Sequence, residues 1–239
     1  MAEYDDDRLV DGLAELAGLL LAEESLEETL ARVSQLAVST LPGCDAADLT
    51  LLPDGIPRTM AATDHRATTL DDAQYAAGDG PCLDAARHQH VNLVGSTLSD
   101  ERWPHFCTEA TRLGILSALA MPLQARDVPV GALNLYSTTE FGLGDDTQAS
   151  AQLFAAQAAV AVANARTHAA LRATTAQLEE ALWSRAIIDQ AKGVIIAREH
   201  CSADAAFALL REQSQRENRK VRVVAQEIVD EARTGPPHG

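Results

Sequence analysis

Polar side chains that suit nucleic-acid recognition recur near the C-terminus at a helical spacing. Arg211, Ser214, Gln215, Asn218 and Arg222 follow one another at intervals of three or four residues, which places them on one side of a helix and its exit turn. Guanidinium, amide and hydroxyl groups together suit phosphate oxygens and exposed base edges. The spacing predicts a nucleic-acid contact, and the alternative that it leaves open is a solvated polar face.

Further cations extend this pattern. Arg219 and Lys220 fall in the exit turn, and Arg185 and Lys192 are seven residues apart, which is two turns along one face of a preceding helix. Lys192 and Lys220 are the two lysines of the chain. The cationic side chains therefore gather in one late segment of the sequence.

The charge of the chain is divided by segment. The 239 residues carry a formal net charge of -16, which argues against nonspecific binding of nucleic acid by the chain as a whole. Residues 1–183 carry 10 Lys+Arg against 27 Asp+Glu, whereas residues 184–239 carry 9 against 8. Two domains with different partners would require such a division.

The residues before position 145 mix helical and strand patterns. They predict two helices, of which the second is capped by Ser25 and ended by Pro42-Gly43, and two short strands about an Asp54-Gly55 turn. A short helix, a Gly-Asp-Gly loop, a helix opened by Pro81, a strand at 91–95, a helix ended by Gly114 and a hairpin over 115–137 follow. The fold class predicted for 8–165 is α+β, an antiparallel sheet with helices on its faces.

A long helix is expected from position 145 onward, because no strand pattern returns and proline is absent until position 236. Asp145-Asp146, like Asp71-Asp72, are interpreted as acidic residues of a helix N-terminus. A weak heptad seam predicts a paired connecting helix over 145–183, and the alternative is a single helix against its own domain. The residues of this seam are Val160, Asn164, Thr167, Leu171, Thr174 and Leu178.

The C-terminal part, 178–233, is predicted to form an all-α bundle of three helices. Ser202 is the expected N-cap of the second helix and Asn218 that of the third. Gly193 lies within the first helix, where glycine is costly, so we expect a close backbone or ligand approach there. Residues 234–239 are expected to form a disordered tail.

This C-terminal segment resembles an ANTAR domain, an RNA-binding antitermination module of bacterial regulators. The resemblance rests on "SRAIIDQAKG" at 184–193, "AFALLREQS" at 206–214 and "NRK" at 218–220, and Val223 departs from it where a polar residue is expected. It implies that the chain binds paired RNA hexaloop hairpins as a dimer and relieves transcription termination. The RNA contacts that it implies are Arg185, Lys192, Arg211, Ser214, Asn218, Arg219, Lys220 and Arg222.

The segment 8–165 resembles a GAF domain, a small-molecule sensory fold, through its order of helices and strands and through "GDGPCLDA" and "VGALNLYSTTEFGLGDD". Some GAF domains that bind cyclic nucleotides carry an N-K, F, D-E pattern. Asn134, Phe141 and Asp145-Asp146 match this pattern, but Leu135 replaces the lysine, which argues against a cyclic nucleotide. The identity of a small-molecule effector is therefore open.

The candidate residues for an effector site are Tyr75, Cys82, Trp103 and His105. Cys82 follows Gly-Asp-Gly-Pro at the start of a helix, where the helix dipole is expected to lower the pKa of its thiol. The alternatives are a buried structural cysteine, packing roles for the aromatic residues and a surface histidine. No metal site is expected, because the 4 cysteines are scattered and no histidine has a metal-ligand neighbour at helical spacing.

The hypothesis that unites these features is a signal-responsive, RNA-binding antitermination regulator without enzymatic activity. We expect it to be a cytoplasmic homodimer, paired through its GAF and connecting helices, with neither a secretory signal nor a membrane span. One alternative is a redox enzyme or sensor of the methionine sulfoxide reductase type, which would use Cys82 and Cys107. Another is a DNA-binding regulator with a helix-turn-helix-like tail.

Overall fold

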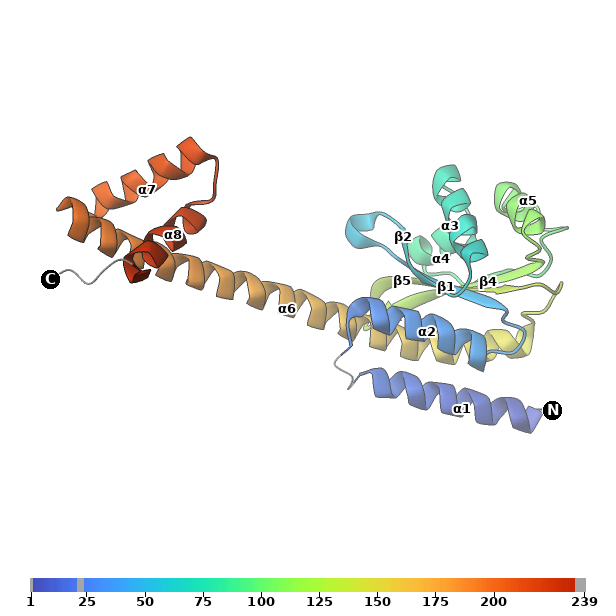
Figure 1. Cartoon of the computed structure of the whole chain (residues 1–239). Coiled ribbons are helices and arrows are strands. Elements are labelled where there is room, and N and C mark those ends of the chain that lie inside the picture. Colours follow the sequence, from blue (N-terminus) through green and yellow to red (C-terminus); the bar gives the residue numbers. More distant parts are fainter. Residues whose placement is uncertain (1, 21–23, 235–239) are drawn as a thin grey trace. The chain divides into compact units, whose positions relative to one another are not determined.

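The structure is a computed structural model that describes residues 2–20 and 24–234 (Figure 1). It divides into two compact units, Met1–Ala169 and Ala170–Gly239. Both contain part of α6 (Asp145–Glu199), a helix of 55 residues. No helix in the described part of the chain is both long and apolar enough to cross a membrane.

The first unit is built on one antiparallel sheet of five strands in the order β2-β1-β5-β4-β3. The α+β class predicted from the sequence is thereby confirmed. Figure 1 shows the strands, whose bounds are β1 (Ala46–Leu51), β2 (Arg58–Ala62), β3 (Asn92–Val94), β4 (Ser117–Ala125) and β5 (Val128–Ser137).

Helices cover both faces of this sheet (Figure 1). On one face, α1 (Ala2–Leu19), α2 (Leu26–Thr40) and the first part of α6 bury apolar side chains against the inward residues of β1, β4 and β5. The other face carries α3 (His65–Ala77), α4 (Pro81–His88) and α5 (Pro104–Arg112). The period of two along a strand explains the division, since Ala47 and Leu49 face the first group of helices while Ala46 faces the second.

Local sequence signals set the ends of these helices as predicted. Ser25 caps α2 in a capping box with Glu28, in which Ser25 N donates to Glu28 Oε2 at 2.8 Å. Pro81 occupies the first turn of α4, and Gly114, just after α5, has a φ of 74°, which a side chain would make unfavourable.

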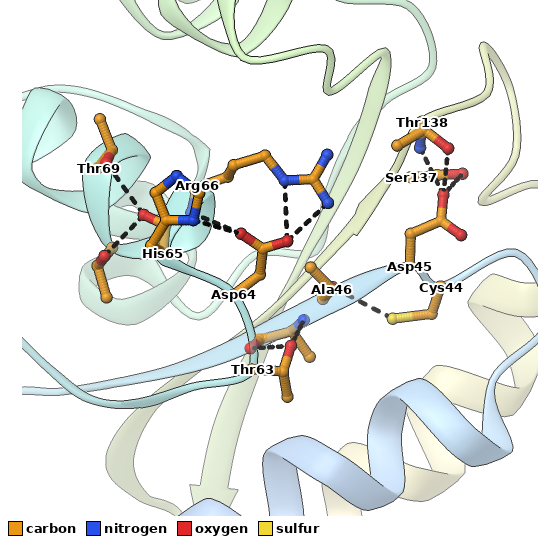
Figure 2. Close-up of polar contacts among 12 residues, drawn as sticks. Cys44, Asp45, Ala46, Thr63, Asp64, His65, Arg66, Thr69, Ser137 and Thr138 are labelled. Atoms are coloured by element: carbon orange, nitrogen blue, oxygen red, sulfur yellow. Dashed lines mark hydrogen bonds and ion pairs between the residues drawn. The ribbon is translucent and has the colours of Figure 1, made fainter.

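Short polar contacts fix the entries to β1 and α3 (Figure 2). The Asp45 carboxylate accepts from the Thr138 backbone N–H at 2.7 Å and from its hydroxyl at 2.6 Å. Asp64 caps α3 by accepting from Arg66 N at 2.8 Å and also holds the Arg66 side chain. The Cys44 thiol donates to the Ala46 carbonyl oxygen, which gives this buried cysteine a structural role.

The residues of the predicted heptad seam are exposed on α6. Val160, Leu171 and Leu178 have exposed fractions of 40%, 62% and 61%. The hydroxyls of Thr167 and Thr174 donate to the carbonyl oxygens of Ala163 and Ala170, so each is satisfied within its own helix. The seam therefore presents apolar and internally bonded polar groups, while helix pairing stays a prediction.

The described residues of the second unit form the end of α6, α7 (Ala203–Glu217) and α8 (Val221–Thr234). Ser202 caps α7 as predicted, with its hydroxyl accepting from Ala205 N at 3.2 Å. Small apolar residues make the core, as their spacing indicates. The buried residues are Ile187, Ala191, Ile195, Ala206, Leu210, Val224, Ala225 and Val229.

Two local predictions for this unit are wrong. Asn218 ends α7 in the left-handed conformation (φ 51°, ψ 44°) and is not the N-cap of α8, because two further residues precede that helix. The close backbone approach expected at Gly193 is absent, since a Cβ there would meet no described atom within 4 Å apart from the nearby backbone of its own helix, whereas the approach of a ligand stays a prediction. Thr234, assigned to the expected tail, is the last residue of α8, and the remainder of that tail, 235–239, lies outside the described residues.

Candidate functional site

The turn between α7 and α8 is held by its own hydrogen bonds. Asn218 N–H and Arg219 N–H donate to the carbonyl oxygens of Gln215 and Ser214, at 3.3 and 3.0 Å. Asparagine tolerates the left-handed conformation that this geometry needs. The Ser214 hydroxyl donates to the Arg219 carbonyl oxygen from the other side. The turn is therefore a defined corner that carries cations at fixed positions.

Ser214 does not present its hydroxyl to solvent, contrary to the expectation that it lies on the same exposed side as Arg211. Only 9% of the residue is exposed, and its hydroxyl is bonded within the turn. The reason is helical geometry, since Ser214 follows Ala206 and Leu210 along the buried line of α7. The buried Ser214 hydroxyl therefore stabilises the turn through its bond to the Arg219 carbonyl oxygen.

The exposed cations of the corner are Arg211 and Lys220, with the Asn218 side chain beside them on the surface. Within residues 2–20 and 24–234, neither Arg211 nor Lys220 has an ion-pair partner. Arg185, on α6, is likewise exposed and unpaired in this part of the chain. These side chains can meet phosphate oxygens without first losing a protein contact.

The other predicted cationic contacts are engaged with carboxylates. Arg219 donates to Glu227 Oε2 at 2.8 Å and to Glu217 Oε2 at 3.2 Å, and Arg222 pairs with Glu180. Lys192 Nζ donates to Asp189 Oδ1 at 3.1 Å. The hydrogen bonds from Arg219 lower the pKa of Glu227. These pairs are at least partly exposed to solvent, so water and salt screen them and a phosphate can replace the carboxylate at a small cost.

The first unit contains a second group of functional side chains, buried between the sheet and helices α3 and α4. We call it the buried polar cluster. Its members are Asp48, Thr50, Asp71, Tyr75, Cys82, Asn134 and Tyr136. Polar groups buried at this depth need partners, so their hydrogen bonds define what the cluster can do.

Asn134 and Asp48 form the centre of this cluster. Asn134 Nδ2 donates to Asp48 Oδ1 at 2.7 Å and approaches the Cys82 sulfur at 3.0 Å. The Tyr136 hydroxyl donates to Asp48 Oδ2 at 2.9 Å. Asn134 Oδ1 has no hydrogen-bond partner among the described residues, although Asn134 is only 2% exposed. An unpartnered buried acceptor of this kind leaves one position for a donor.

Asp71 forms the other end of the cluster. Its Oδ2 accepts from the hydroxyls of Thr59, Thr50 and Tyr75, at 2.5, 3.2 and 3.3 Å. The interpretation of Asp71 as a residue of a helix N-terminus is wrong, because α3 begins at His65 and Asp71 lies buried within it. Asp145 and Asp146 do lie in the first turn of α6.

The structure brings together two of the four predicted effector-site residues. Tyr75 and Cys82 both contact Thr50 Oγ1, at 2.8 and 3.2 Å. Trp103 packs in a separate cluster under the Arg102 guanidinium, and His105 is exposed on α5. Sequence reasoning missed Asp48, for which the signal was the alternation Ala46, Asp48, Thr50 on one face of β1.

Burial controls the ionisation of this cluster. It raises the pKa of Asp48, which the nearby Asp71 carboxylate raises further, and it raises the pKa of Asp71 itself. Burial also raises the pKa of the Cys82 thiol, so the expected lowering by the helix dipole is wrong. Burial raises the pKa of Cys107 to about 11. Thiols held neutral in this way are poor nucleophiles, which argues against the reductase-type alternative.

The space beside the cluster is small. The hollow lined by Gln74, Cys82, Asn134 and Tyr136 together with apolar residues leaves a volume of about 0 Å³ for a water-sized molecule. Pockets that enclose drug-sized ligands measure roughly 300–1,000 Å³. An effector of ordinary size would therefore require the cluster to open, by movement of α4 or of the loop before it.

Replacing Asp48 by Asn should stabilise the first unit at pH 8 more than at pH 5. The raised pKa of Asp48 means that, above about pH 4, this carboxyl holds its proton in the folded state but loses it in the unfolded state. The stability of the parent chain therefore falls as the pH rises above about 4. The amide keeps its bond with Asn134 without a buried charge. We expect Tm to rise by about 2–4 °C for each kcal/mol by which the cost of the buried charge is reduced. Thermal unfolding is followed by the fluorescence of Trp103 in a Trp183→Phe chain.

Asp45→Asn is the matched control with the opposite sign. Hydrogen bonds from Thr138 lower the pKa of Asp45, so the charged form contributes stability above the unfolded pKa that is lost as the pH falls through the folded pKa. Asp45→Asn should therefore lower Tm at pH 8, and this effect should shrink as the pH falls below about 4, the pKa of an unperturbed Asp. Equal destabilisation by Asp48→Asn at pH 5 and pH 8 would contradict the assignment of a buried carboxyl with a raised pKa.

Comparison with known proteins agrees with this division of the chain. Residues 23–163 match the family model of the GAF domain, and the chain belongs to this family. Residues 176–229 match the ANTAR domain. The chain thus joins an N-terminal GAF domain to a C-terminal ANTAR domain, the architecture of a GAF-controlled, RNA-binding regulator of the antitermination type. A search among curated proteins gives no match.

Solved structures show the same fold for the first unit. The GAF domain of a phosphoenolpyruvate-protein phosphotransferase from Coxiella burnetii has 19% identity and a TM-score of 0.53, covering 68% of this chain and 97% of that chain. The corresponding domain from Acinetobacter has 14% identity and a TM-score of 0.51, covering 66% and 95%. The reduced form of fRMsr of Staphylococcus aureus has 14% identity and a TM-score of 0.51, covering 64% and 94%.

Proposed function

We propose that the chain binds RNA hairpins through the corner between α7 and α8 and thereby relieves transcription termination. The observation that carries this proposal is that Arg211 and Lys220, on either side of the turn at Asn218, are exposed and have no ion-pair partner among the described residues. RNA hairpin loops offer phosphates together with unpaired base edges, which suit guanidinium, ammonium and amide groups at fixed spacing. Arg185, Lys192, Arg219 and Arg222 supply the remaining phosphate contacts.

The proposed active form is a homodimer that holds two hairpins. Val160, Leu171 and Leu178 form an exposed stripe at heptad spacing on α6, and Asn164 is a polar residue that can set the register. Pairing of two copies along this stripe would join two RNA-binding units. The second hairpin then binds at a high effective concentration, which raises the affinity for a tandem pair.

The GAF domain is the proposed control element, with the buried polar cluster as its sensing site. A small effector that donates a hydrogen bond to Asn134 Oδ1 would satisfy the one acceptor of the cluster that lacks a partner among the described residues. Its entry requires the cluster to open. Opening would change the packing of α4 on β4 and β5. The first part of α6 packs on the other face of these two strands. The proposed signal is this change in packing.

The direct test is selection of RNA from a library of tandem hexaloop hairpins with randomised loops. We expect enriched hairpin pairs that bind the full chain and lose affinity steeply with added salt, with a slope of about -0.7 to -0.9 in log K per log salt for each phosphate contacted. Duplex DNA of the same sequence serves as the control. Equal or tighter binding of the duplex would contradict the proposal and favour the DNA-binding alternative. Failure to enrich any hairpin would also contradict the proposal.

A further inference from the structure

An exposed tryptophan on the RNA-binding unit is not used by any of the contacts proposed above. The chain has 2 tryptophans. Trp103 is 9% exposed and packs in the first unit, whereas Trp183, on α6, is 51% exposed. Tryptophan is enriched at interfaces, because its indole offers a large apolar face together with an N–H donor.

Trp183 lies in a groove between α6 and α8. The groove has a volume of about 470 Å³ and a largely apolar floor. Val223, the residue that departs from the ANTAR pattern, adds apolar surface beside the indole and is 38% exposed. The residues that line the groove are Glu180, Trp183, Arg222, Val223, Gln226 and Glu227.

The charges at this groove are paired with one another, and the apolar floor admits a neutral ring. Glu180 pairs with Arg222, and Glu227 accepts from Arg219, so the two carboxylates at the groove hold the two arginines beside it. A nucleobase has a neutral π-face that stacks on an indole. If the phosphates of an RNA replace these carboxylates on Arg219 and Arg222, an adjacent unpaired base comes within reach of the indole.

A second copy of the chain is the competing occupant. The heptad stripe on α6 includes Leu171 and Leu178, and Leu182, one turn beyond Leu178 and 69% exposed, adds apolar surface beside it. Trp183 is the next residue and is turned by about 100° from Leu182 around the helix axis, toward α8. Pairing along the stripe therefore leaves the indole uncovered, and we favour RNA as its occupant.

We propose that Trp183 and Val223 form a stacking subsite for one unpaired nucleobase of the bound RNA. This inference rests on the proposed RNA-binding function and adds a recognition element to it. The stacked base contributes affinity that depends on the presence of the base and hardly on salt, unlike the contacts of Arg211 and Lys220.

The test uses the full chain with Trp103→Phe, in which Trp183 is the one remaining indole. The probes are the selected hairpin pair and a series of copies in which one loop nucleotide at a time is abasic. We expect RNA to quench the emission of Trp183 with the same midpoint as binding followed by anisotropy. One abasic position should remove the quenching and weaken binding by about tenfold.

Substitution of Trp183 supplies an independent measurement. Trp183→Ala should weaken binding by about tenfold without changing its salt dependence, and the same abasic position should then have no further effect. Trp183→Phe should retain most of the affinity. Circular dichroism and thermal melting check that each variant is folded, and the emission experiment does not depend on either variant.

The outcomes separate this subsite from the proposed function. The subsite would be overturned, and RNA binding left intact, if anisotropy shows binding while the emission of Trp183 is unchanged. The same holds if no abasic position weakens binding. Emission that changes with protein concentration in the absence of RNA would show that a second copy covers the indole, and this too overturns the subsite. Failure of every hairpin to bind would overturn both.

Discussion

We expect the Arg211→Ala/Lys220→Ala chain to bind the selected hairpin pair about 100-fold more weakly than the parent chain at ~0.1 M salt. Both side chains are exposed and unpaired within the described residues, so their removal leaves no protein carboxylate without its partner. The change therefore acts on RNA binding rather than on folding. Anisotropy titrations over a range of salt concentrations measure the effect, and the slope should become less steep by about 1 to 2.

The matched control is Arg216→Ala with Arg233→Ala. Arg216 lies on α7 and Arg233 on α8, and their side chains are 68% and 67% exposed. The control therefore removes two positive charges from the surface, as many as the Arg211→Ala/Lys220→Ala chain. Arg216 lies on a different side of α7 from Arg211, five residues along the helix. We expect less than about a threefold loss from this control, through long-range electrostatics alone. Equal losses from the two variants would show that overall charge, and not the corner, determines binding.

The second large effect is expected from charges on the heptad stripe. Leu171→Glu with Leu178→Glu places two carboxylates on the line along which two copies are proposed to pair. Because both leucines are exposed in the single chain, the fold of each unit should be kept. We expect dissociation to monomers and a loss of affinity for the tandem hairpin pair of about 100-fold, with little change for a single hairpin.

Ala173→Glu with Ala176→Glu is the control for this experiment. Both alanines are exposed on α6 and lie away from the stripe, so the added charge is the same while the proposed seam is intact. Light scattering or sedimentation measures the oligomeric state of each variant. An unchanged dimer after substitution of Leu171 and Leu178 would contradict pairing along this stripe, and weakened binding to a single hairpin would contradict the explanation by effective concentration.

The elements that sequence predicts best here are those set by local chemistry. The capping box at Ser25, the proline at the start of α4 and the glycine after α5 each determine a helix end within a few residues, whatever the rest of the chain does. Helical spacing likewise identifies the buried line of α7 through Ala206 and Leu210. Such signals were sufficient for the fold class and for the three-helix tail.

Errors arose where position depends on contacts between distant parts of the chain. Ser214 continues the buried line of α7, but its type suggests an exposed donor, and its bond to the Arg219 carbonyl oxygen depends on the path of the turn. Cys82 lies at a helix start, where the dipole alone would lower its pKa, yet burial beside Asp71 and Asp48 dominates. Asn134 and Asp48 are 86 positions apart in sequence, and only the pairing of β1 with β5 brings them together.

Chemical footprinting of the two lysines tests the central claim most directly. The chain has only Lys192 and Lys220, so acetylation of each can be followed by mass spectrometry without overlap. Lys220 is exposed and lies at the corner, and Lys192 is paired with Asp189. We predict that saturating hairpin RNA slows acetylation of Lys220 by at least about tenfold, and that Arg211→Ala shifts this protection to higher RNA concentration. Unchanged reactivity of Lys220 in a chain fully bound to RNA would contradict the account.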